Sequence, residues 1–218
     1  MDEAERRRAQ EGAEDAQARL DALLAERLAA GSVDGSAPSR LPGWSVGHVL
    51  THVARNADGI VRVLLASETG EVVERYPGGQ ATRDGDIEAG NARLAADLVG
   101  DVRATGDRLR ETWSAQTRWD GRSREVRGVE IPVVDLPMVR WREVEVHTVD
   151  LGLGVEAADW PSLFVRLELR AMEMRWRARR PMGMSGLPPE ALVVDPRTRL
   201  AWLYGRTEIS GLGPAGVL

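Results

Sequence analysis

Hydrophobic residues recur every three or four positions over four long stretches of the chain, which is the spacing of amphipathic helices. The clearest stretch follows Ser45, a residue type that favours the N-cap position, and its apolar stripe continues for about five turns. The predicted helices cover residues 3–30, 45–68, 86–114 and 136–151. Four long helices joined by loops predict an antiparallel four-helix bundle.

The pattern changes after the fourth helix, which Gly152 is placed to end. Pro161 suits the first turn of a fifth helix that runs to about Arg180. Beyond it we predict a short strand at residues 191–194 and a short helix at 197–204. The last third of the chain is therefore predicted to contain one helix and shorter elements, unlike the four long helices before it.

A short hairpin is predicted within residues 119–133, where apolar residues alternate around Val126. Taken together, the patterns predict a mainly α protein with a small α+β appendage. The predicted domains are a four-helix bundle at residues 1–153 and a small α+β domain at residues 154–218.

Composition excludes several kinds of chemistry. The 218 residues include no cysteine, which excludes disulfides, a cysteine nucleophile and a thiolate metal site. All 29 basic residues are arginine, so a Schiff-base lysine and a P-loop lysine are also excluded. Any metal must therefore be held by the three histidines and by carboxylates.

Charge and hydropathy argue against a nucleic-acid or membrane partner. The net charge is −5, and the arginine clusters at residues 6–8 and 177–180 are interleaved with acids, which argues against nucleic-acid binding. The first ten residues are highly charged and do not form a signal peptide, and no apolar run approaches the ~20 residues that span a bilayer. We therefore expect a cytoplasmic protein with no membrane partner. The sequence leaves the oligomeric state open and is compatible with a monomer.

The histidines fall on two of the predicted helices. On the helix at 45–68, His52 lies about 120° from the centre of the apolar stripe, so it faces either solvent or a polar site between helices. His48 lies further round on the same side, and we interpret it as a supporting or structural residue.

On the helix at 136–151, a polar stripe with spacings of three and four residues contains Arg140, Glu143, His147 and Asp150. Glu143 and His147, at i and i+4, can bind one cation from a single helix face, as the two histidines of H-E-x-x-H zinc helices do. With His52 they would form a set of two imidazoles and one carboxylate that suits zinc or another divalent metal such as Fe(II). Such a pair is also common as a surface ion pair, which is the alternative interpretation.

Three segments resemble the mycothiol-dependent maleylpyruvate isomerase family. The segment LPGWSVGHVLTHVARN (Leu41–Asn56) resembles the family's G-W-[ST]…H signature, and REVEVHTVDLG (Arg142–Gly152) resembles its second metal helix. The segment WLYGR (Trp202–Arg206) resembles its C-terminal G-R motif. The resemblance spans nearly the whole chain and implies the family's fold, a DinB-like four-helix bundle followed by a short C-terminal domain.

The resemblance implies a reaction and a set of site residues. The zinc ligands would be His52, Glu143 and His147, and the catalytic arginine, which suits a carboxylate, would be Arg206, with Arg140 as the second choice. The implied activity is the cis–trans isomerisation of maleylpyruvate to fumarylpyruvate by thiolate addition, bond rotation and elimination. Mycothiol would be the cofactor, and the setting would be actinobacterial gentisate degradation.

The absence of cysteine agrees with a borrowed thiol. Two alternatives stay open from the sequence. One is a mycothiol S-transferase that conjugates an electrophile in detoxification or natural-product biosynthesis, and the other is a bundle without catalytic activity that binds a ligand or a partner. Asp150 would orient a ligand histidine or simply precede the end of the helix.

Overall fold

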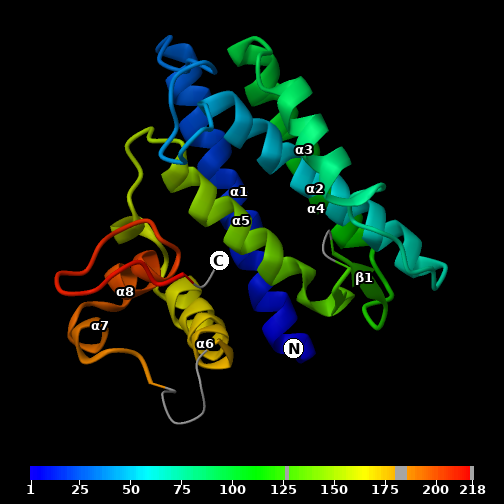
Figure 1. Ribbon diagram of the computed structural model, residues 1–218. Helices are drawn as coiled ribbons and strands as arrows, with labels where there is room; N and C mark the ends of the chain where they lie inside the picture. Colours follow the sequence, from blue (N-terminus) through cyan, green and yellow to red (C-terminus); the bar gives the residue numbers. More distant parts are fainter. Residues whose placement is uncertain (126–127, 180–185, 217–218) are drawn as a thin grey trace. The chain divides into compact units, whose positions relative to one another are not determined.

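The computed structural model describes residues 1–125, 128–179 and 186–216, and it is mostly helical (Figure 1). The chain forms two compact units, Met1–Leu153 and Gly154–Leu218. Within the described residues, no helix is both long enough and apolar enough to cross a membrane.

Four long helices form the core of the first unit, and they confirm the predicted bundle (Figure 1). Each of α1 and α2 packs against both α4 and α5, so the apolar stripes of the four helices face one another. The helices are α1 (Glu3–Ala29), α2 (Val46–Glu68), α4 (Ala95–Ala115) and α5 (Leu136–Asp150). Ser45 caps α2 as predicted, because its side chain accepts a hydrogen bond from the backbone N–H of His48.

The single helix predicted at residues 86–114 is wrong, because the chain forms α3 (Gly79–Gly90) and α4 with a break between them. The break packs closely on α2. A Cβ atom on Gly90 would lie 2.6 Å from Thr51 Cγ2, and the carbonyl oxygen of Asn91 would be 2.0 Å from a Cβ atom on Gly47. Leu94, which the periodicity assigned to the core, is 74% exposed in this turn.

The predicted hairpin is confirmed by β1 (Arg122–Arg124) and β2 (Glu130–Pro132), which pair antiparallel with Ser123 opposite Ile131. Val126, which contributed to the prediction, lies outside the described residues. A 3-10 turn, η1 (Val133–Asp135), follows the hairpin and leads directly into α5.

The second unit contains η2 (Ala157–Asp159), α6 (Ser162–Ala178), α7 (Pro189–Val193) and α8 (Pro196–Leu203). Helix α8 packs against α6 and η2, and it confirms the short helix predicted at 197–204. Helix α6 confirms the fifth helix, with Pro161 at its N-cap, one position before the predicted one. Arg180, the predicted end of this helix, lies outside the described residues.

The strand predicted at residues 191–194 is wrong, because residues 189–193 form the helical turn α7. Pro189 occupies the start of this turn, where its fixed φ and missing N–H favour a helix, and Glu190 follows with a favourable charge. Leu192 and Val193, whose apolar side chains suggested a strand, are exposed. The described residues of this unit therefore contain helices only, and the two-stranded sheet lies in the first unit.

Candidate metal centre

Helices α2 and α5 bring His52, Glu143 and His147 together. His52 Nε2 lies 2.9 Å from Glu143 Oε2, and His147 Nε2 lies 3.3 Å from the same oxygen. The two imidazole rings are almost perpendicular, with their centroids 4.7 Å apart. One potential ligand atom from each residue lies within 4.8 Å of the others, and in the described part of the chain this is the one such group of three.

The first turn of α2 supports His52. The ring of Trp44 stacks on His48 at 6.0 Å and meets His52 edge-on at 5.6 Å. His48 itself completes the helix cap, because its Nδ1 accepts from the backbone N–H of Ser45 at 3.1 Å. Its Nε2 lies 3.1 Å from Glu88 Oε2. His48 is therefore a structural residue beside the group and not a member of it.

Burial and hydrogen bonds set the charges in this group. Burial lowers the pKa of His52 to about 4, so its ring is neutral near pH 7. Burial alone would raise the pKa of Glu143, but hydrogen bonds from His147 and His52 hold that pKa well below its usual value. The group therefore presents a carboxylate facing two imidazoles.

Asp150 orients His147. Burial alone would lower the pKa of His147, but the hydrogen bond from its Nδ1 to Asp150 Oδ2, 2.9 Å long, raises it, and Glu143 adds to this effect. Metal-binding histidines commonly donate their second ring N–H to a carboxylate in this way, which leaves the other nitrogen free for the metal. Two imidazoles, one carboxylate and this supporting contact fit the donor set of a zinc site with three protein ligands.

Comparisons with known proteins identify the family of this chain. The family model described as "Mycothiol maleylpyruvate isomerase N-terminal domain" matches residues 13–152, which include the whole group of three. The chain belongs to this family. No curated protein matches the chain significantly.

Two solved structures share the fold of this family member. A crystal structure of the mycothiol-dependent maleylpyruvate isomerase is similar with a TM-score of 0.75 and 21% identity, over 95% of this chain and 90% of that chain. A histidine-to-alanine mutant of that enzyme is similar with a TM-score of 0.75 and 20% identity, over the same shares of the two chains. The likeness confirms the predicted fold over nearly the whole length of the chain.

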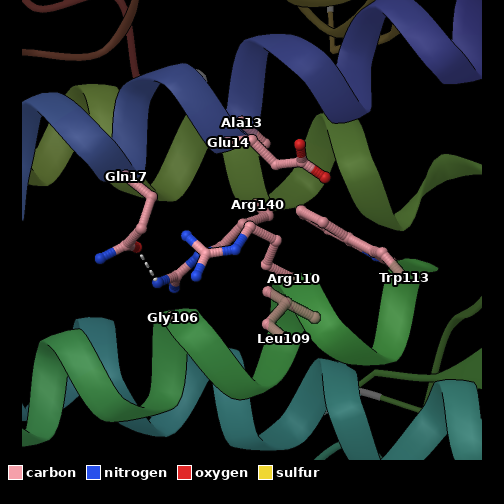
Figure 2. A pocket seen from close by; sticks show the side chains of 8 residues that line it. All are labelled: Ala13, Glu14, Gln17, Gly106, Leu109, Arg110, Trp113 and Arg140. Atoms are coloured by element: carbon pink, nitrogen blue, oxygen red, sulfur yellow. Dashed lines mark hydrogen bonds between the residues drawn. The ribbon is translucent and has the colours of Figure 1, made fainter. Parts of the chain in front are cut away.

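Arg140, the second choice for a substrate-binding arginine, lies inside the bundle of this family member. Its Nη1 donates to Val53 O at 2.8 Å and to Asn56 Oδ1 at 3.0 Å, and its Nη2 donates to Gln17 Oε1 at 2.7 Å. Burial lowers its pKa to about 10, so it stays charged near pH 7. Figure 2 shows this guanidinium and Gln17 beside a cavity of about 20 Å³ between α1 and α4, which is room for about one water. Arg140 therefore connects three helices, and these hydrogen bonds are to residues outside the metal group.

Arg206 lies in the second unit, just after α8. Its backbone N–H donates to Ala201 O at 2.8 Å, and its Nη1 donates to Tyr204 O at 2.6 Å. These contacts hold the residue at the end of the helix. Its catalytic role remains a prediction.

Arg83 is a site residue that the sequence reasoning missed. It lies on α3, and its Nη2 donates to His52 Nδ1 at 3.1 Å. Residues 79–85 were predicted to lie outside the helices, and Ile87 is the one buried residue of α3, so no apolar stripe predicted the orientation of this helix. Only the packing of α3 against α2 brings Arg83 to His52.

Proposed function

We propose that this protein is a zinc- and mycothiol-dependent isomerase that converts maleylpyruvate to fumarylpyruvate. The observation that carries the proposal is the group formed by His52, Glu143 and His147 within the region that matches the family model. Another divalent metal would fit the same donors, but zinc suits two imidazoles and a carboxylate with a position left open.

The residues of the chain would act as follows. His52, Glu143 and His147 would hold the metal, while Asp150 and Trp44 keep the two rings in place. When bound, the metal and mycothiol would supply a thiolate that could add to the cis double bond, allow rotation about the resulting single bond, and be expelled to give the trans isomer. Arg206 is proposed to bind a substrate carboxylate through its planar fork.

The proposed function implies which partners the enzyme has and where in the cell it acts. Its partners would be a small-molecule substrate and a thiol cofactor, with no nucleic acid and no membrane involved. The reaction would take place in the cytoplasm as a step of gentisate degradation.

The test is a metal analysis followed by an isomerisation assay. We expect the wild-type protein to bind one zinc ion and, with mycothiol, to convert maleylpyruvate to its trans isomer. His147→Ala should lose both properties. The matched control is His48→Gln, because glutamine at this position preserves the capping box of α2.

Two other outcomes of this assay would argue against an isomerase. A stable mycothiol adduct in place of a released isomer would indicate the S-transferase alternative. Unchanged maleylpyruvate and no adduct, with zinc and mycothiol both present, would overturn the proposal.

A further inference from the structure

Arg83 has the contacts of a residue that changes partners when the metal binds. Its Nη2 donates to His52 Nδ1, while its Nη1 lies 2.8 Å from Asp84 Oδ1. The guanidinium carbon lies 5.9 Å from the centre of the Tyr76 ring. The side chain is 18% exposed, so part of it can be reached from solvent. Arg83 therefore stands at the edge of the group and also directly contacts it.

The contact between Arg83 and His52 is compatible with only one arrangement of the His52 ring. Arginine donates hydrogen bonds and accepts none, so His52 Nδ1 must be the acceptor and carry no proton. In a neutral ring the proton then lies on Nε2, the nitrogen that faces Glu143.

Metal binding reverses this arrangement. If His52 binds the metal through Nε2, the proton of the neutral ring moves to Nδ1. The Nδ1–H and the guanidinium N–H would then be two donors facing each other at 3.1 Å. The Arg83 guanidinium must therefore leave His52 in the metal-loaded protein, and its Nη2 then needs a new acceptor.

We propose that Arg83 binds a carboxylate of the substrate in the metal-loaded protein, and that the site thereby favours carboxylate-bearing substrates over neutral electrophiles. This inference rests on the proposed function and names the residue that would recognise the substrate. The planar guanidinium can donate two parallel hydrogen bonds to a carboxylate.

The charge of the site favours the same class of ligand. A divalent metal with Glu143 as its one carboxylate ligand has a net charge of about +1, and Arg83 adds a further positive charge. Asp84 offsets this charge only in part, because its side chain is 53% exposed and its charge is screened by solvent. The buried carboxylate of Asp150 beside His147 lowers the net charge to about +1 before any thiol binds. This remaining positive charge favours a carboxylate-bearing ligand over a neutral electrophile.

Two neighbouring arginines do not hydrogen-bond to His52 as Arg83 does. Arg140 donates to three acceptors inside the bundle, and Arg75 forms an ion pair with Glu125 and is buried. Among the arginines that the structure describes, Arg83 is the one that donates to His52, and metal binding through Nε2 would remove this hydrogen bond.

The experiment measures binding of maleate, a cis-dicarboxylate, to the zinc-loaded protein by calorimetry, together with the zinc affinity of the metal-free protein. Mycothiol and turnover are not needed, so failure of the isomerase proposal would not hide the result. The variants are Arg83→Gln and Arg83→Lys. The control is Arg62→Gln, which removes an exposed arginine on α2, the same helix as His52.

We expect Arg83→Gln to weaken maleate binding about tenfold or more, as the loss of a charge-assisted hydrogen bond predicts. The same variant should bind zinc several-fold more tightly, because a glutamine oxygen can accept from His52 Nδ1 and a positive charge is gone. Arg83→Lys should retain part of the maleate affinity, and Arg62→Gln should leave both affinities unchanged. Equal maleate affinities in the wild type and Arg83→Gln, or no maleate binding by the wild type, would overturn the inference.

Discussion

Asp150 provides a graded test of how the metal centre is organised. Its carboxylate is fully buried, at 0% exposure, and lies 2.9 Å from His147 Nδ1. Asp150→Asn keeps the size of the side chain and an acceptor oxygen but removes the charge. A charge-assisted hydrogen bond contributes about 2 kcal/mol and a neutral one about 1 kcal/mol, so the difference is about 1 kcal/mol.

That difference corresponds to a loss of zinc affinity of about fivefold. Asp150→Ala removes the acceptor entirely, and its loss should approach the upper end of the roughly 10–100-fold range for partners of metal-binding histidines. The order of zinc affinities should therefore be wild type, then Asp150→Asn, then Asp150→Ala.

The assay is a competition titration of zinc between the metal-free protein and a chromogenic chelator. Circular dichroism shows whether each variant is folded under the same conditions. Asp101→Asn is the control, because Asp101 is also a paired carboxylate with a largely buried side chain, but its partners are Arg55 and Arg93. Wild-type zinc affinity in a folded Asp150→Ala variant would refute the role assigned to this carboxylate.

Three further predictions concern packing, pH and catalysis. Gly12→Ala should lower the free energy of unfolding, measured by chemical denaturation, by about 1–3 kcal/mol. The reason is that the added Cβ would lie 2.5 Å from ring atoms of Trp141. Unchanged stability would contradict the close contact between α1 and α5 at this position. Burial lowers the pKa of His147, but the hydrogen bond to Asp150 raises it above its usual value, so protons compete with zinc for this ring at higher pH than for an ordinary histidine. Zinc affinity should therefore fall as the pH is lowered through this raised pKa, and a constant affinity across the neutral range would argue against it. Arg206→Ala should reduce the kcat/KM of isomerisation about tenfold and leave the zinc affinity unchanged. Full activity of this variant would show that Arg206 does not bind the substrate.

The long helices and the metal group could be predicted from the sequence because both depend on local periodicity. The apolar stripe of α2 and the cap at Ser45 locate that helix almost to the residue. The spacing of Glu143 and His147 places both side chains on one face of α5. His52 lies off the apolar stripe of α2, and a bundle gives such a residue few places to face other than a neighbouring helix or solvent.

The elements that the sequence did not predict depend on contacts between distant residues. The break between α3 and α4 lies where Gly90 packs on Thr51 and Asn91 packs on Gly47. The hydrophobic periodicity of one segment gives no information about such contacts with another segment. The apolar residues Leu192 and Val193 suggested a strand, but the preceding proline favours a helical turn and no second strand is present in the described residues of that unit to pair with it.

The buried helices α2 and α5 and the short polar helix α3 are expected to have different roles, one in metal binding and the other in substrate binding, and experiments can distinguish these roles. The metal group lies on α2 and α5, whose positions are fixed by extensive burial, whereas Arg83 lies on the short polar helix α3. Substitution of Asp150 should therefore change zinc affinity while the zinc-saturated protein still binds maleate normally. Substitution of Arg83 should weaken maleate binding and, in the opposite direction, strengthen zinc binding. If both variants instead altered both affinities in the same direction, metal binding and substrate recognition would form one coupled unit, and selection of the substrate could not be assigned to α3.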